Sequence, residues 1–128
     1  MPTQHTVLIV EDMREVRETL YEGLSFHSYR VIPVATVQEA EEALQRLGAA
    51  EIALVITDIN LTPDPHAQEG YALYQRWRTL YPALRFILIS GDPRNQELPD
   101  IRAGVVRLLV KPFGIDTLLA VVRELLGR

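Results

Sequence analysis

Short apolar segments rich in β-branched residues alternate along the chain with stretches of helical periodicity. Within the stretches, apolar residues recur on one helical face, as Val16, Leu20 and Leu24 do. A repeated strand–helix pattern of this kind predicts a parallel sheet with helices on both faces. The segments that we predict to be strands cover residues 6–10, 30–35, 52–57, 84–90 and 105–110.

The make-up of individual segments indicates the order of the strands. Residues 53–56 and 87–89 are apolar without alternation, as expected for central strands buried on both faces. The second segment contains Pro33, which has no N–H for a sheet ladder and therefore suits an edge. These features favour an α/β fold with a doubly wound five-stranded parallel sheet of order 2-1-3-4-5. Ligands of such sheets bind beyond the carboxyl ends of the strands, here between the first and third.

Local signals predict where helices begin and end. Thr36 and Glu39 form a capping-box pattern, and Gly48 marks the end of the helix that follows. Pro99 lies within residues 94–103, so we expect a short helix starting near Pro99 or an irregular segment. The buried face of the third helix is predicted to comprise Leu73, Tyr74, Trp77 and Leu80.

The composition is that of one globular domain, which we place at residues 1–128. Hydrophobic residues make up 48% of the chain, and the absence of cysteine excludes disulfides and thiolate metal sites. The formal net charge of -4 argues against an autonomous nucleic-acid binder. Neither a signal peptide nor a membrane span is recognisable, so we expect a soluble cytoplasmic protein.

Chemically distinctive side chains stand where the predicted strands end. They are Glu11 and Asp12 after the first strand, Asp58 after the third, Ser90 at the end of the fourth and Lys111 after the fifth. All of these positions belong to one rim of the sheet. Neighbouring carboxylates repel one another, and a hard divalent cation such as Mg²⁺, which prefers oxygen ligands, would neutralise them. Lys111 would supply a second, permanent positive charge.

This set of groups suits phosphoryl transfer to a carboxylate. Asp58 would attack, while the cation, Lys111 and the Ser90 hydroxyl would each bind one phosphoryl oxygen. Taken singly, the residues have ordinary alternatives: Asp12 as the cap of the first helix, the others as turn residues or a solvated lysine. We favour the phosphoryl site because the residues coincide on one rim.

Glu11-Asp12, Asp58, Ser90 and Lys111-Pro112-Phe113 together resemble the receiver domain of bacterial two-component response regulators. The resemblance covers the chain nearly end to end. It implies a flavodoxin-like fold and a phosphorylation-controlled switch, not a conventional enzyme. It also implies that the bond between Lys111 and Pro112 is cis.

The resemblance implies a role for each site residue. Asp58 would be the phospho-acceptor, and its donor a phosphohistidine on a sensor histidine kinase or phosphotransfer protein. Mg²⁺ would be bound by the side chains of Asp12 and Asp58, by the backbone carbonyl of Asn60 and, through water, by Glu11. Further candidate partners are a downstream protein target and a second copy of the chain; nucleic acid and membranes are not expected partners. Kinase contacts are expected at Met13, Arg14, Arg17 and residues 112–114.

The chain departs from the family pattern in three places. Receivers commonly carry an aromatic switch residue three positions before the lysine, where this sequence has Leu108. Residues 61–69, which include His66, form a longer loop than the family usually has before its glycine, here Gly70. Pro99 disturbs the fourth helix, part of the face through which many receivers signal.

Two other functions stay open. A degenerate receiver would act only as a protein-interaction module, which Leu108 allows but the intact acidic residues disfavour. A small aspartyl-phosphate phosphatase is the less favoured alternative. Asp58-Ile-Asn60-Leu-Thr62 faintly resembles the Asp-x-Asp-x-Thr motif of haloacid-dehalogenase-type phosphatases, but those enzymes need a second acid where this chain has Asn60.

Overall fold

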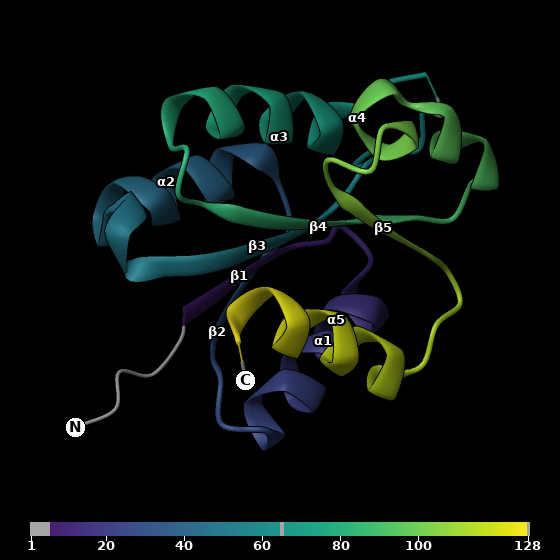
Figure 1. Ribbon diagram of the computed structural model, residues 1–128. Helices are drawn as coiled ribbons and strands as arrows, with labels where there is room; N and C mark the ends of the chain where they lie inside the picture. Colours follow the sequence, from purple (N-terminus) through teal and green to yellow (C-terminus); the bar gives the residue numbers. More distant parts are fainter. Residues whose placement is uncertain (1–5, 65, 128) are drawn as a thin grey trace.

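The computed structural model describes residues 6–64 and 66–127 and contains a five-stranded parallel sheet between two layers of helices (Figure 1). The strands are β1 (Thr6–Val10), β2 (Arg30–Val34), β3 (Ile52–Asp58), β4 (Arg85–Ser90) and β5 (Arg107–Val110). Their order is β2-β1-β3-β4-β5, which confirms the predicted topology. β1 has the predicted bounds, and the others differ from their predictions by one or two residues.

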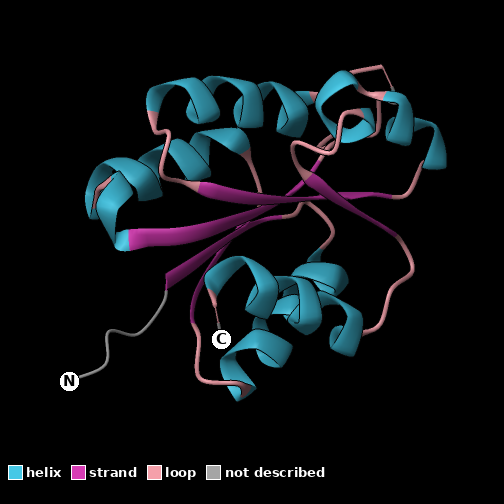
Figure 2. Ribbon diagram, in the orientation of Figure 1, coloured by secondary structure: helices cyan, strands magenta, loops and turns pink. Residues whose placement is uncertain are grey.

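The helices are α1 (Arg14–Phe26), α2 (Val37–Leu47), α3 (Glu69–Leu80), α4 (Pro99–Arg102) and α5 (Ile115–Leu126), with two 3-10 helices, η1 (Ala49–Glu51) and η2 (Pro93–Glu97). α2, α3 and α4 cover one face of the sheet, and α1 and α5 cover the other (Figures 1 and 2). Among the helices of the described segments, none is long and apolar enough to cross a bilayer.

Each face of the sheet has its own hydrophobic core. The core beneath α2 and α3 includes Val55 and Trp77, and the core beneath α1 and α5 includes Ile56 and Leu118. Neighbouring residues of β3 therefore point into opposite cores, as strand geometry requires. Because β1, β3 and β4 are packed on both faces, the positions of their carboxyl ends are firmly held.

The predicted start and end of α2 are confirmed. Thr36 is its N-cap residue, and Oγ1 accepts a hydrogen bond from the backbone N–H of Glu39 at 3.1 Å. The Glu39 carboxylate accepts from the backbone N–H of Ala35 at 2.9 Å, one residue before the position of an ideal capping box. Gly48 ends the helix with φ +85°, a conformation that favours glycine. The strand that contains Pro33 is an edge strand, as predicted.

Two details of the secondary structure refine the prediction. Leu80 is 64% exposed, so its assignment to the buried face of the third helix is wrong; it is the last residue of α3, where the chain leaves the helix. The segment around Pro99 contains η2 and then the four-residue α4, which starts at Pro99 as expected.

Candidate functional site

The predicted site residues lie along the carboxyl ends of the strands. Asp58 and Ser90 are the last residues of β3 and β4, Glu11 and Asp12 follow β1, and Lys111 follows β5. Asp58 lies opposite the residue that precedes Ser90 in the register of β3 and β4. The fold thus brings groups from distant parts of the chain to one rim of the sheet.

Three carboxylates form a compact cluster at this rim. One oxygen from each of Glu11, Asp12 and Asp58 lies within 4.8 Å of the other two. Glu11 and Asp58 are buried, whereas Asp12 is exposed. A set of hard oxygen donors with one side open to solvent has the composition and the access that a divalent-cation site needs.

Lys111 reaches the same cluster from the end of β5. Its Nζ donates a hydrogen bond to Asp58 Oδ2 at 2.5 Å and lies 3.1 Å from Glu11 Oε2. Burial opposes the charged form, but the hydrogen bond and charge of Asp58, followed by those of Glu11, raise the pKa of Lys111 above its ordinary value. The ammonium group therefore keeps its charge among the carboxylates. The Lys111–Pro112 bond is cis, as the resemblance implied.

Glu11 is held in an environment that disfavours its charge. Burial and, to a smaller extent, the charge of Asp58 together raise the pKa of Glu11 to about 7 against the opposing effect of Lys111. Oε1 accepts a hydrogen bond from the backbone N–H of Met13 at 3.1 Å. Oε2 is buried and accepts no hydrogen bond from the described residues. Lys111 Nζ lies near this oxygen as an ion-pair partner, at 3.1 Å, and a buried carboxylate beside two further carboxylates fits a bound cation.

The alternative assignment of Asp12 as the cap of the first helix is wrong. The N-cap residue of α1 is Met13, and no side chain provides the capping hydrogen bond. The acidic side chain that contacts the start of α1 is Glu11, which turns inward because the chain leaves β1 with this residue buried. The exposed carboxylate of Asp12 belongs instead to the acidic cluster.

Asn60 and Arg17 hold the backbone and carboxylates of the cluster in place. The backbone N–H of Asn60 donates to Asp58 Oδ1 at 2.9 Å and so orients this carboxylate. Arg17 Nη1 donates to the carbonyls of Glu11 at 2.9 Å and Asp12 at 3.3 Å. This role of Arg17 was not predicted from the sequence. The one feature that could have suggested it is the position of Arg17 in the first turn of the helix that follows Glu11 and Asp12.

A residue beside Ser90 was not predicted from the sequence. Asn95, which is buried in η2, donates from Nδ2 to Ser90 Oγ at 2.6 Å. The preceding Gly91-Asp92-Pro93 indicates only a turn, so no signal in the sequence pointed to a buried amide.

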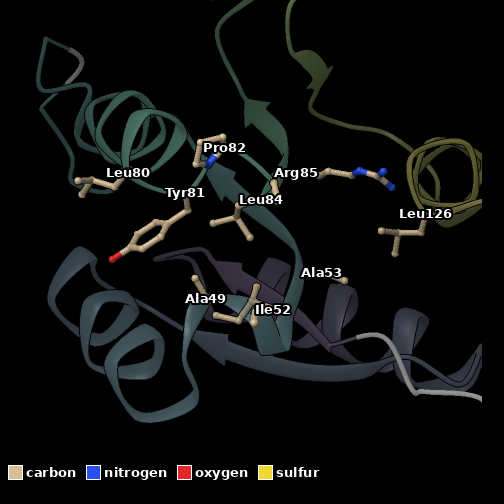
Figure 3. Close-up of a pocket in the computed structure, with 11 residues that line it drawn as sticks. Ala49, Ile52, Ala53, Leu80, Tyr81, Pro82, Leu84, Arg85 and Leu126 are labelled. Atoms are coloured by element: carbon tan, nitrogen blue, oxygen red, sulfur yellow. The ribbon is translucent and has the colours of Figure 1, made fainter.

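A hollow of about 540 Å³ lies at the opposite rim of the sheet (Figure 3). It surrounds Ile52 and Arg85, the first residues of β3 and β4. Arg85 is the one charged group among the described residues that line it, and its guanidinium donates to the carbonyl of Leu125. The hollow therefore lacks the set of polar groups that the carboxyl rim brings together.

Known proteins with similar sequences are response regulators. The transcriptional regulatory protein PmrA of Pectobacterium parmentieri is 34% identical over 125 residues, which make up 95% of this chain and 52% of that protein. The response regulator protein FleR of Pseudomonas aeruginosa is 34% identical over 124 residues, 95% of this chain and 25% of that protein. The chain thus spans between a quarter and about half of the length of these curated relatives.

Similarity also extends to the fold and to the whole family. The crystal structure of a response regulator from Thermotoga maritima superimposes with a TM-score of 0.80 at 25% identity and covers 98% of this chain and 100% of that one. The family model described as the response regulator receiver domain matches residues 7–123. The chain therefore belongs to the response regulator receiver family, whose domains are phospho-accepting signalling modules that work with histidine kinases and are not conventional enzymes.

Proposed function

We propose that Asp58 takes a phosphoryl group from a phosphohistidine on a sensor histidine kinase or phosphotransfer protein. The observation that carries this proposal is the convergence of the Lys111 ammonium and three carboxylates at the end of β3. The side chains of Asp12 and Asp58, the backbone carbonyl of Asn60 and, through water, the carboxylate of Glu11 would hold Mg²⁺. When bound, the ion neutralises the carboxylates and the oxygens of the incoming phosphoryl group.

The transfer step exchanges one bond for another. A carboxylate oxygen of Asp58 attacks phosphorus, so that a P–O bond forms and the P–N bond to the imidazole breaks. The electron pair of the broken bond stays on the imidazole nitrogen, which takes a proton from water. The Asn60 N–H orients the attacking carboxylate. Lys111 Nζ and Ser90 Oγ then bind two of the phosphoryl oxygens and balance their charge.

Phosphorylation by a small donor tests this proposal. Incubation of the protein with Mg²⁺ and acetyl phosphate is expected to give one lasting, acid-stable and base-labile phosphoryl adduct by intact-mass measurement. Asp58→Asn should abolish the adduct, because an amide is not a nucleophile toward phosphorus. Asp64→Asn, at an exposed position in the loop after β3, is the matched control and should keep it.

The two alternative functions give different results in the same assay. A protein-interaction module without phosphoryl chemistry would show no adduct in the wild-type chain. A phosphatase would turn over acetyl phosphate rapidly without accumulating the adduct. Either result would contradict the proposal.

The affinity for Mg²⁺ is expected to depend on pH through Glu11. The pKa of this buried carboxyl is raised to about 7, so below that pH the metal-free protein holds a proton that the cation must displace. Affinity should therefore fall by up to about tenfold for each unit of pH below 7. Calorimetric titration with Mg²⁺ at about pH 6 and about pH 8 measures this change. Glu11→Gln should remove most of it, and equal wild-type affinities at the two pH values would refute the assignment.

The surface beside the site supports the predicted kinase contacts in part. A hollow of about 280 Å³ lies between α1 and residues 111–113, with Val16 and Phe113 in its lining. Met13 is 53% exposed and Arg14 is also exposed, so both are accessible to a partner. Arg17 is less suitable as a contact, because it already binds the backbone of the acidic turn.

The remaining expectations stand as proposals. A single receiver domain over residues 1–128 is supported by the one sheet, to which all described strands belong, and by the family match over residues 7–123. The downstream protein target, the homodimer and the cytoplasmic location stay predictions from the sequence.

A further inference from the structure

The hydroxyl of Ser90 is fully engaged by its own loop. Ser90 is completely buried, and its Oγ donates to the carbonyl of Asp92 at 3.0 Å. The same oxygen accepts hydrogen bonds from the backbone N–H of Asp92 at 2.9 Å and from Asn95 Nδ2 at 2.6 Å. A hydroxyl has one donor and two acceptor positions. Ser90 therefore has to leave the Asp92 carbonyl before it can donate to a phosphoryl oxygen.

Asn95 connects this hydroxyl to a second segment of the chain. Its Nδ2 also donates to Asn60 Oδ1 at 3.4 Å, and its Oδ1 accepts from Gln68 Nε2 at 3.4 Å. Gln68 is the N-cap residue of α3, and Asn60 Nδ2 donates to the carbonyl of Ala67 at 3.4 Å. One buried amide thus joins the end of β4 to the segment that enters α3.

We propose that Asn95 is a positioning residue that restrains Ser90 in the unphosphorylated protein and transmits its release to residues 67–69. The inference rests on the proposed function, because a phosphoryl group on Asp58 is what draws Ser90 away. Once Ser90 turns toward that group, Asn95 Nδ2 loses an acceptor, and a buried donor without an acceptor is unfavourable. Asn95 then follows Ser90 or turns toward water, and its bond with Gln68 changes in both cases.

The surroundings of Asn95 permit this movement. η2 is a 3-10 helix of five residues, and hydrogen bonds in such short segments have poorer geometry than those of an α-helix. A polar cleft of about 540 Å³ opens beside Asn95 and Gln68 and extends to His66. Water in this cleft can replace the hydrogen bonds that the amide gives up.

The test follows backbone amides by NMR in the full chain with Mg²⁺ and beryllofluoride, a mimic of a phosphoryl group on a carboxylate. In the wild-type protein, beryllofluoride should shift the signals of Asp92 and Asn95 and also those of residues 67–69. In Asn95→Ala the shift of Asp92 should persist, whereas the shifts of residues 67–69 should fall below about half of the wild-type size.

Binding of beryllofluoride provides a second measurement on the same variant. Asn95→Ala should bind it about three- to tenfold more tightly, because a hydrogen bond that favours the resting orientation of Ser90 is gone. A residue with only a structural role would leave the affinity unchanged or weaken it. Unchanged or weaker binding, or wild-type shifts at residues 67–69, would overturn the inference.

A second variant, at the partner of the Asn95 carbonyl oxygen, keeps the test valid if Asn95→Ala does not fold. Gln68→Met keeps the length of a half-buried side chain and the Ser90–Asn95 bond but removes the donor to Asn95. It should lose the shifts of residues 67–69 and keep that of Asp92. Gln75→Met, on the exposed face of α3, is the matched control and should behave like the wild type.

The outcomes separate this inference from the function on which it rests. If Gln68→Met transmits the wild-type shifts to residues 67–69, the coupling through Asn95 is refuted although Asp58 still binds beryllofluoride. If the wild-type chain fails to bind beryllofluoride at all, the function of Asp58 is contradicted, and this inference falls with it.

Discussion

Replacing Gly70 with alanine is expected to destabilise the protein by at least about 3 kcal/mol or to prevent folding. Gly70 is the second residue of α3, and its N–H donates to the carbonyl of Ile59 at 2.9 Å. A Cβ at this position would lie 1.7 Å from the carbonyl oxygen of Asp58 and 2.8 Å from its carbonyl carbon. Both atoms belong to the backbone of β3, which is packed on both faces, so the strand cannot move aside without displacing Asp58, the proposed phospho-acceptor.

Chemical denaturation measures this loss of stability, and two other glycines serve as comparisons in the same experiment. A Cβ at Gly23 would lie 2.3 Å from Cδ1 and 2.7 Å from Cγ1 of Ile115, a side chain that can change rotamer, and alanine is favoured over glycine inside a helix by about 1 kcal/mol, so Gly23→Ala should cost about 1 kcal/mol or less. A Cβ at Gly91 would meet no atom within 4 Å, and Gly91→Ala should stay within about 0.5 kcal/mol of the wild type. A Gly70→Ala protein as stable as Gly23→Ala would contradict this prediction. It would show that the backbone of β3 can move to accommodate the added Cβ.

The fold was predictable where hydrophobic pattern alone decides the structure. β3 and β4 are apolar without alternation because helices cover both of their faces, and Pro33 stands at an edge because it cannot donate to a neighbouring strand. The placement of the predicted site residues at one rim of the sheet was predictable for the same reason. Asp58 and Ser90 end their strands, and parallel strands present their carboxyl ends at one rim.

Contacts within the site were not predictable, because they depend on packing between distant segments. The sequence around Asn95 indicates a turn, and only the folded chain brings its amide to Ser90 and Gln68. Glu11 and Asp12 are adjacent carboxylates, and the direction of the backbone after β1 decides which one is buried. The need for glycine at position 70 likewise becomes visible only in its distance from the carbonyl of Asp58.

Lys111 is the only lysine of the sequence, and every other Lys or Arg position holds arginine. Its ammonium group lies between Asp58 Oδ2 and Glu11 Oε2, at 2.5 and 3.1 Å. A compact point charge fits between two carboxylates that face each other, whereas a planar guanidinium presents its donors as a broad fork. The geometry therefore accounts for lysine at this position.

Lys111→Met is expected to destabilise the metal-free protein by about 3–5 kcal/mol at about pH 8. The reason is that Glu11 and Asp58 would remain as neighbouring buried carboxylates without a counter-charge. Burial already raises the pKa of Glu11 to about 7 while Lys111 opposes the rise, so the variant should hold the Glu11 proton to still higher pH. The contribution of Glu11 to this loss changes only between its pKa in the wild type, about 7, and its higher pKa in the variant, so the loss should shrink as the pH falls toward 7 and change little below it.

Denaturation in EDTA and in excess Mg²⁺ separates charge from packing at this position. Mg²⁺ should restore most of the stability of Lys111→Met, because the cation replaces the missing ammonium among the carboxylates. Lys111→Arg keeps a positive charge and should lose less than Lys111→Met in EDTA. Adding Glu11→Gln to Lys111→Met removes one of the two unpaired charges and should recover part of the loss. A loss that is insensitive to pH, to Mg²⁺ and to Glu11→Gln would mean that the side chain stabilises the fold through its methylene contacts, and that the carboxylates tolerate one another without it.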